Sequence, residues 1–460
     1  MRGGRSVSGP GRGQAHCAAA RFGAVHCAAV VCRREYSGGV KKSDIVIIGG
    51  GAAGSQIAQV LSRAGKTAVI VDPRDEPVEL PPLTDGLFGD ELTVTPLPVP
   101  PGTARITAEA VRVEQGAVHL ADGRVLEAES IVIATGLRPR PSPIPGGYTV
   151  GSLSEAQALR AAVLGTESTN PNPEASVEDG APKSTGSLPR LGVLGSGFLA
   201  LEIARSAADR GVEVSLHLRG DLPLPGTSPE LGRAVLALNE AAGVHCVPHD
   251  PNPDVASADV WAAAVGSRPV LPECSWPLTF SGRLAVGADL QVVPGVWAVG
   301  DCAEPVEGPN AGLGDGGAEP TALSQGLWLG RVLAGEDVDA RWHEVPSRWS
   351  FQGTTRMFTA GASYSVCDPN PVALGDIRAG RGQLLFFSGP EEDSVVLRVE
   401  TIGLPPAHNA AKRLLGPVLA EGLDAIAEGH QMPGAVTRKE AAAPDFDMRR
   451  RARQPAGRIA

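Results

Sequence analysis

The sequence predicts an α/β fold with two doubly wound, parallel-sheet units and a smaller α+β unit towards the C-terminus. Two observations carry this prediction. A pattern of buried strand, glycine-rich turn, helix and strand occurs twice, over residues 44–72 and 190–219. The chain has 460 residues, of which 42% are hydrophobic, which is enough for two or three cores. One copy of the pattern alone would be a weak signal, but two copies imply two dinucleotide sites.

The first copy meets the requirements of a diphosphate-binding turn. An apolar strand over residues 44–48 leads into three glycines that permit, in order, the tight turn, the close approach of a diphosphate, and the packing of the helix on the strand. The helix expected over 52–64 points its first amides at the same place. The strand expected over 67–71 leads to a carboxylate that can accept hydrogen bonds from a ribose diol. The predicted first-site residues are Gly49, Gly51, Ala52, Ala53, Gly54 and Asp72.

The second copy has Gly195, Gly197 and Ala200 at the three positions, alanine being a known variant at the third. The strand expected over 212–218 leads to Arg219, where the first copy ends in a carboxylate. Because a carboxylate repels a 2′-phosphate and an arginine pairs with one, this site is predicted to favour NADPH over NADH. Two alternatives stay open: Arg219 is a solvated side chain at a strand end, or this copy persists only as scaffold.

Composition excludes several function classes. The formal net charge of −10 argues against nucleic acid or an anionic membrane as the main partner. No run of about eighteen apolar residues occurs, so we expect no membrane span. The seven cysteines are odd in number and scattered, which favours a reducing, cytoplasmic location, and they form no ligand-like cluster with the nine histidines, so no metal site is expected.

The cysteine positions also exclude a redox dithiol beside the first fingerprint. Cys27 and Cys32 precede the first strand, and the next cysteine is Cys246. A reactive disulfide serving the first site would have to follow that fingerprint. No cysteine pair is therefore placed to serve the first site.

Three segments are expected to lie outside the compact units. Residues 1–42 contain Glu35 as their only acidic residue and fit either a disordered leader, which we favour, or a transit segment that would direct the protein to the mitochondrial matrix. Residues 166–189 form a polar, low-complexity stretch and are predicted to be a flexible loop. The third segment is the polar, basic stretch 433–460, which is predicted to be a disordered tail. It follows residues 341–432, which are predicted to form the α+β unit.

Several further segments resemble the two-dinucleotide-domain flavoprotein oxidoreductases. Residues 134–136 are similar to that family's Ala-Thr-Gly turn beside the flavin dinucleotide, residues 265–269 to its Val-Gly-x-x-Pro junction, and residues 297–301 to the segment whose aspartate contacts FAD. The resemblance covers residues 43–432 and implies a discontinuous FAD domain (43–147 and 275–335) with an NAD(P) domain inserted (148–274). By resemblance, the cofactor-binding residues also include Thr135, Gly136, Gly266, Gly300, Asp301 and Gln325.

Two segments resemble the ferredoxin or rubredoxin reductase branch, which includes apoptosis-inducing factor. Residues 79–84 (Glu-Leu-Pro-Pro-Leu-Thr) are similar to the branch's Glu-Arg-Pro-Pro-Leu-Ser, and residues 349–352 (Trp-Ser-Phe-Gln) to its Trp-Ser-Asp-Gln. The resemblance places Trp349 at the edge of the flavin.

The departures from the branch pattern concern the reactive edge of the flavin. Leu80 and Asp85 stand where the branch has an arginine and a lysine. Glu202 matches the glutamate that pairs with that lysine, and it is the candidate catalytic residue. The second unit also looks short, because about fourteen residues separate Cys246 from Trp261 where relatives carry a three-stranded meander.

The resemblance implies FAD as cofactor and NAD(P)H as substrate, with hydride passing from nicotinamide C4 to flavin N5. A small iron–sulfur protein of the ferredoxin or rubredoxin type is the implied electron acceptor, and a homodimer is compatible with the family. Two other functions stay open: an NAD(P)H oxidase or quinone reductase on the same fold, and a catalytically weakened flavoprotein that acts as a binding protein.

Overall fold

The computed structural model describes residues 41–165, 188–313, 318–428, 430, 432 and 434–453. The predicted leader up to residue 40, with Cys27 and Cys32, and residues 166–187 of the predicted loop lie outside the described residues. Within the described ranges, no helix is both long enough and apolar enough to cross a membrane.

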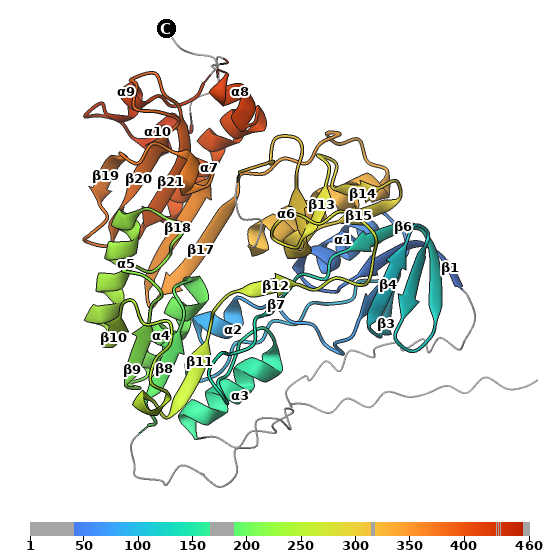
Figure 1. The fold of residues 1–460 in the computed structure, drawn as a ribbon. Helices are drawn as coiled ribbons and strands as arrows, with labels where there is room; N and C mark the ends of the chain where they lie inside the picture. The colour runs from blue at the N-terminus through green and yellow to red at the C-terminus, as the bar shows by residue number, and fades with distance from the viewer. Residues whose placement is uncertain are drawn as a thin grey trace, which may run out of the picture. The chain divides into compact units, whose positions relative to one another are not determined.

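The first sheet has eight strands around a parallel centre (Figure 1). β1 pairs in parallel with β2 on one side and β6 on the other, and residues 45–48 of β1 are buried on both faces, as a central parallel strand requires. The chain leaves this sheet and later returns to it through the antiparallel pair β14 and β15, of which β15 pairs in parallel with β6. The strands in spatial order are β14 (Gln291–Val293), β15 (Val296–Ala298), β6 (Val125–Ile133), β1 (Lys41–Ile48), β2 (Ala68–Asp72) and β3 (Thr103–Thr107), with β5 (Ala117–Leu120) paired to β6 and β4 (Ala110–Glu114) paired to β5.

The second sheet is fully parallel and has four strands. The strands in spatial order are β10 (Val244–Val247), β9 (Val214–His217), β8 (Leu191–Leu194) and β11 (Val260–Ala263). Along the sequence β10 is followed by β11, and the residues between them form only one regular element, the 3₁₀ turn η2 (Val255–Ser257). Both parallel sheets confirm the doubly wound α/β prediction.

The third sheet is antiparallel, has five strands, and forms the predicted C-terminal α+β unit. Its strand β21 is buried along its whole length. Side chains on one face, such as Leu397 and Val399, pack with helix α7, while Ile402 on the other face packs with the second unit. The strands in spatial order are β17 (Ser347–Gln352), β18 (Thr355–Gly361), β21 (Val396–Ile402), β20 (Arg381–Phe387) and β19 (Val372–Asp376).

Two short strand pairs and the helices complete the described fold. The antiparallel pair β7 (Leu137–Pro139) and β12 (Ser267–Pro269) joins the two connections between the parallel sheets, and β13 (Leu284–Val286) pairs with β16 (Ala303–Pro305). The helices are α1 (Ala52–Arg63), α2 (Pro82–Asp85), α3 (Leu153–Leu164), α4 (Phe198–Asp209), α5 (Pro229–Ala241), α6 (Glu319–Ala334), α7 (Pro405–Ala420), α8 (Leu423–Ala427), α9 (Arg438–Ala441) and α10 (Met448–Arg451), with 3₁₀ turns η3 (Gly300–Cys302) and η4 (Tyr364–Val366).

The expectation of a disordered tail from residue 433 is wrong for residues 434–453. This segment forms α9 and α10 and buries Val436, Ala441 and Met448 in the core beneath α7. An ion pair between Arg451 and Glu440 (2.7 Å) holds the two short helices together. Three apolar side chains spread through a basic stretch give no periodic signal, so tertiary contacts decide this part of the fold.

Candidate functional site

In the first glycine turn, the packing of the fold requires two of the glycines, whereas free space lies beside the other one, Gly51. A Cβ on Gly49 would lie 2.3 Å from the Ala134 carbonyl oxygen, and a Cβ on Gly54 would lie 1.9 Å from the Gly49 carbonyl oxygen. These two positions allow β1, β6 and α1 to pack. At Gly51 the nearest atom to a Cβ would be Arg74 Nη2, at 3.9 Å. The turn is therefore open at Gly51, where the first amides of α1 can meet a diphosphate.

Asp72 is at the predicted strand end, but its carboxylate already has four hydrogen bonds. It accepts from the Gly50 amide (2.6 Å), from the Arg74 amide (2.9 Å), and from Arg74 Nε (2.9 Å) and Nη2 (2.7 Å). Burial alone would raise the pKa of this carboxyl, but the Arg74 guanidinium and the two amides outweigh burial and lower the pKa below its usual value. A ribose diol can reach Asp72 only if the guanidinium moves aside, so Arg74 belongs to this part of the site.

The second glycine turn repeats this arrangement. A Cβ on Gly195 would lie 2.5 Å from the Ala264 carbonyl oxygen, so this glycine is required for packing, and Ala200 is fully buried at the third position. At Gly197 no atom lies within 4 Å of where a Cβ would be. Arg219 is exposed at the end of β9, and its amide donates to Ser196 Oγ (3.0 Å).

The connections between the two parallel sheets cross beside the first turn. Thr135 Oγ1 donates to the Val270 carbonyl, and the Val270 amide donates to the Gly136 carbonyl (3.1 Å). Gly136 and Gly266 both have positive φ values, 67° and 98°. The structure therefore brings the predicted flavin turn and the predicted junction together, with Gly266 on the wall of the pocket described below.

The turn at Gly300 presents an unpartnered carboxylate oxygen. Asp301 Oδ1 is buried and has no hydrogen-bond partner among the described residues. Burial raises the pKa of Asp301, although the positive charges of Arg283 and Arg348 act in the opposite direction. An oxygen in this state fits a ligand hydroxyl that donates to it. Together with the open turn at Gly51, Asp301 makes this region fit an FAD dinucleotide.

Gln325 lies behind the Gly300 turn. Its side chain is 2% exposed, and Oε1 accepts a hydrogen bond from the Gly300 amide at 2.6 Å. The side chain thus fixes the backbone that carries Asp301. The first residues of α6, Glu319 and Pro320, line the pocket instead.

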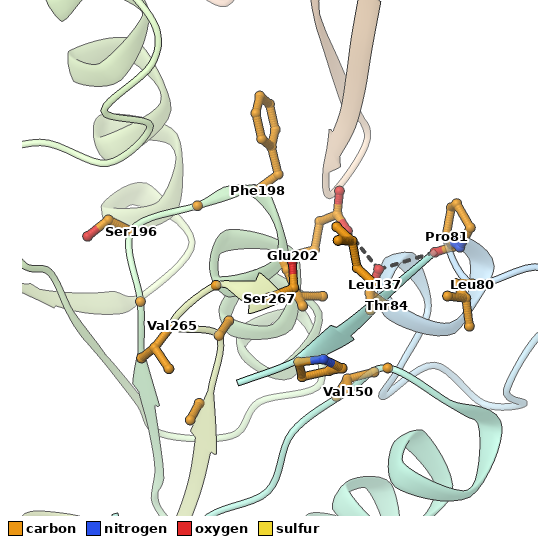
Figure 2. Close-up of a pocket in the computed structure, with 18 of the residues that line it drawn as sticks. Leu80, Pro81, Thr84, Leu137, Val150, Ser196, Phe198, Glu202, Val265 and Ser267 are labelled. Carbon is orange, nitrogen blue, oxygen red and sulfur yellow. Dashed lines mark hydrogen bonds between the residues drawn. The ribbon is translucent and has the colours of Figure 1, made fainter. Parts of the chain in front are cut away.

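A pocket of about 740 Å³ lies between the two dinucleotide sites (Figure 2). Residues 195–197 of the second glycine turn line it, as do Asp301 and the start of α6 from the first site. Its volume falls within the roughly 300–1,000 Å³ of typical small-molecule sites. A molecule that fills the pocket would contact residues of both sites.

Glu202 on α4 lines this pocket and is held by two hydroxyl groups. Thr84 Oγ1, at α2, donates to Glu202 Oε2 at 2.7 Å, and Ser350 Oγ, on β17, donates to Glu202 Oε1 at 2.7 Å. Figure 2 shows the first of these bonds, with Leu80 and Pro81 nearby. Leu80, which replaces the branch's arginine, is 41% exposed and also lines the pocket. The clamp connects three elements that are far apart in sequence.

Trp349 lines the same pocket from β17. Its ring meets Phe351 edge-on, with centroids 5.2 Å apart and planes at 83°. Trp349 is only partly buried, so one part of the indole remains available to the pocket. This position agrees with a place at the flavin edge.

Sequence reasoning missed Arg74, Thr84 and Ser350 as site residues. Thr84 and Ser350 lie in the two segments that choose the branch, so their positions were visible in the sequence. Their joint contact with Glu202, 118 and 148 residues away, was not. Arg74 follows Asp72 by two residues, a spacing that allows a local ion pair at a strand end.

Residues 43–316 match the family described as pyridine nucleotide-disulphide oxidoreductase. The match spans both glycine turns and more than half of the chain, so the chain belongs to this family. It is an FAD-dependent oxidoreductase of the ferredoxin or rubredoxin reductase-like branch, with NAD(P)H as its substrate.

Similar proteins agree with that placement. The chain is 26% identical over 444 residues to rhodocoxin reductase of Rhodococcus erythropolis, covering 88% of this chain and 93% of that protein. It is 24% identical over 427 residues to putidaredoxin reductase CamA of Pseudomonas putida, covering 81% and 91%. Among solved structures, a ferredoxin reductase from Rhodopseudomonas palustris matches with a TM-score of 0.69 and 19% identity, covering 89% of this chain and all of that one, which shows the shared fold.

Proposed function

We propose that this protein takes hydride from NAD(P)H and passes the electrons, one at a time, to a small iron–sulfur carrier of the ferredoxin or rubredoxin type. The observation that carries the proposal is a pocket lined by the second glycine turn and, from the first site, by Asp301 and the start of α6. Bound FAD supplies the chemistry, because a flavin accepts two electrons as hydride and can release them singly. The protein positions the two dinucleotides relative to each other.

The FAD-binding residues in this proposal are those of the first turn and the segments that pack on it. The open backbone at Gly51 and the amides of Ala52 and Ala53 face the diphosphate, and Asp301 accepts from a ligand hydroxyl. Gly49, Gly54 and Gln325 shape the turns, and Trp349 borders the flavin edge. The remaining members of the set are Asp72, Thr135, Gly136 and Gly300.

The NAD(P)H residues are those of the second turn, with Glu202 beside the reacting atoms. Gly195 and Ala200 set the turn, Gly197 leaves room for the diphosphate, and Gly266 borders the pocket. Glu202 is proposed as the catalytic residue because its clamped carboxylate lies on the pocket wall.

The proposed acceptor class rests on how electrons can leave. No cysteine is among the residues that line the pocket in the described part of the chain. The four described cysteines are free thiols, and burial raises the pKa of the Cys302 thiol. An iron–sulfur centre takes electrons singly. Rhodocoxin reductase and putidaredoxin reductase are named for carrier proteins, which supports the same class here.

An anaerobic titration of the purified protein with NADH, and separately with NADPH, tests the first half of the proposal. Stoichiometric bleaching of the flavin absorption band by one nucleotide is the expected result. Steady-state assays with a ferredoxin, a quinone and oxygen as acceptors then test the second half. A preference for quinone or oxygen would favour the oxidase alternative, and an unbleached flavin would favour the binding-protein alternative.

Arg219 is proposed to select NADPH, because the side chain is exposed at the end of β9 and lines the pocket. Arg219→Ala is expected to raise the KM for NADPH by about tenfold, as expected for loss of a charged hydrogen-bonding partner, and to change the KM for NADH by less than about twofold. Steady-state kinetics with both nucleotides give the answer. An equal response of both KM values contradicts this assignment and leaves Arg219 as a solvated residue.

We also infer a cytoplasmic location. The free thiols Cys246, Cys274, Cys302 and Cys367 suit a reducing compartment. Cell fractionation with an antibody against the protein tests this, and recovery with mitochondria would instead support a transit role for residues 1–42.

A further inference from the structure

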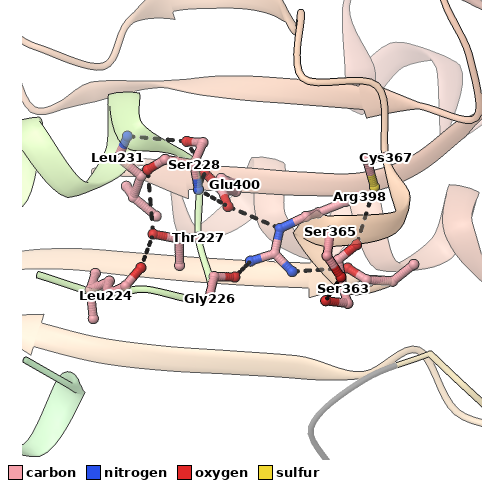
Figure 3. A network of polar contacts seen from close by, with 11 residues as sticks. Leu224, Gly226, Thr227, Ser228, Leu231, Ser363, Ser365, Cys367, Arg398 and Glu400 are labelled. Carbon is pink, nitrogen blue, oxygen red and sulfur yellow. Dashed lines mark hydrogen bonds and ion pairs between the residues drawn. The ribbon is translucent and has the colours of Figure 1, made fainter. Parts of the chain in front are cut away.

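A buried ion pair on the C-terminal sheet contacts the segment between β9 and α5, which we name the 219–228 loop (Figure 3). The pair consists of Arg398 and Glu400 on β21, with Arg398 Nε 2.9 Å from Glu400 Oε1. Arg398 is 7% exposed and Glu400 is fully buried. Because successive strand residues alternate between faces, both project from the face of β21 opposite to α7, towards the second unit.

Most polar contacts of this pair go to the 219–228 loop. Glu400 accepts hydrogen bonds from the Ser228 amide (3.1 and 3.3 Å to its two oxygens) and from the Ser228 hydroxyl. Arg398 Nη2 donates to the Gly226 carbonyl (3.3 Å), and Nη1 to the Ala362 carbonyl (2.9 Å). Replacing a buried ion pair by apolar side chains is often neutral for stability, so stability alone does not explain why one sits in this apolar interface. Its bonds define one position for the loop.

The loop bends sharply between its two anchors. Leu224 is buried with φ of 59°, a conformation that residues other than glycine rarely adopt. Thr227 closes this bend, because its amide and its hydroxyl both donate to the Leu224 carbonyl at 2.9 Å. The surrounding contacts must hold such a bend in place.

The other end of the loop is attached to the second glycine turn. The Leu224 amide donates to the Ser196 carbonyl at 2.7 Å, and the Arg219 amide donates to the Ser196 hydroxyl at 3.0 Å. Ser196 lies between Gly195 and Gly197, and Pro225 of the loop lines the pocket. A continuous set of hydrogen bonds therefore runs from Glu400 and Arg398, through the bend, to the diphosphate-binding turn.

We propose that Arg398 and Glu400 are positioning residues for NAD(P)H: from the C-terminal sheet they hold the 219–228 loop, and through Ser196 the second glycine turn, in the shape that binds the nucleotide. This inference rests on the proposed function, since it assigns a role in the same site. Loosening the loop weakens nucleotide binding, whereas FAD, which binds the first turn, is retained.

Two variants of the holoprotein test the proposal. Arg398→Met with Glu400→Leu removes both charges together, so that neither is left buried alone. Ser228→Ala removes one hydroxyl that contacts Glu400 and also caps α5 by accepting from the Leu231 amide. Thr437→Ala is the matched control, because Thr437 caps α9 in the same way but lies outside this network.

The readouts are the Kd of NAD⁺ and NADP⁺ by calorimetry, the FAD content, the melting temperature, and kcat with KM. Both test variants are expected to weaken the binding of the preferred nucleotide by about tenfold, with kcat within about twofold of the parent and FAD retained, while Thr437→Ala leaves the Kd unchanged. Parental Kd values in both test variants overturn the proposal, whatever happens to the melting temperature. If the parent protein binds neither nucleotide, the proposed function fails first, and the positioning role falls with it.

Discussion

Gly197→Val is expected to yield a yellow, folded protein that NAD(P)H no longer reduces. The backbone at Gly197 is extended (φ −91°, ψ −179°), a conformation open to any residue, and no atom lies within 4 Å of the place a Cβ would occupy. The valine side chain therefore starts in open space, with no contact at its Cβ. It fills the space over the first amides of α4, where the second diphosphate is proposed to lie.

The size of this effect follows from the contacts that the valine blocks. Hydrogen bonds to a charged group contribute about 1.5 kcal/mol or more each, so blocking two of them weakens nucleotide binding by about 100-fold. Anaerobic titration with NADPH measures the loss, and chemical reduction by dithionite shows that the flavin remains reducible.

Gly51→Val is the matched control, since its backbone is also extended (φ −76°, ψ −164°) and the nearest atom to a Cβ would be Arg74 Nη2, at 3.9 Å. Here the valine takes up space at the first glycine turn, where the FAD diphosphate is proposed to lie, so the protein is expected to lose FAD and purify colourless. The Gly197→Val protein should melt within a few degrees of the FAD-bound parent, and the Gly51→Val protein within a few degrees of the parent apoprotein. A change of about 1 kcal/mol in the free energy of unfolding moves the melting temperature of a protein of this size by only a few degrees. A yellow Gly51→Val protein, or a Gly197→Val protein that NADPH bleaches normally, contradicts the assignment of that turn.

The features that could be predicted from the sequence are those with a local cause. Each glycine fingerprint contains its strand, turn and helix within about thirty residues, so periodicity and glycine spacing are sufficient. The helix expected over 52–64 is observed at 52–63, and the strand expected over 67–71 at 68–72. The boundary differences of one residue are those that fraying ends produce.

The features that could not be predicted depend on contacts between distant segments. Asp72 is where the fingerprint places it, but the saturation of its carboxylate by Arg74 becomes visible only in the structure. Gln325 lies on α6 and its side chain points at the Gly300 amide, a direction that the family resemblance does not determine. The apolar residues of the tail from 434 to 453 are too sparse to predict a fold before their core is known.

Glu202 is partly predictable. The family resemblance predicts its position in the site, but it does not predict which residues form hydrogen bonds with its carboxylate. The branch pairs this glutamate with a lysine, whereas here the hydroxyls of Thr84 and Ser350 donate to it. Ser350 in turn accepts from Gln352 Nε2 (2.9 Å), and Gln352 Oε1 accepts from Asn239 (3.0 Å). Both Gln352 and Asn239 are fully buried, so this chain of bonds fixes the carboxylate firmly at the pocket wall.

Glu202→Gln is expected to slow the reduction of the flavin by NAD(P)H by about 100-fold, the lower range for a positioned ionisable group. Glutamine has nearly the same shape, and each hydroxyl can either donate or accept, so the clamp survives while the charge is lost. Stopped-flow absorbance measures the rate, and the FAD content and melting temperature are expected to match the parent.

Thr84→Val is the comparison that separates the charge from its position. It keeps the carboxylate but removes one donor, so we expect a smaller loss, of about tenfold or less, consistent with one hydrogen bond. If Glu202→Gln reduces the flavin at the parental rate, the carboxylate acts only as a structural link between α2, α4 and β17. If Thr84→Val is the slower of the two, the orientation of Glu202 matters more than its charge, and its role is that of a positioning residue.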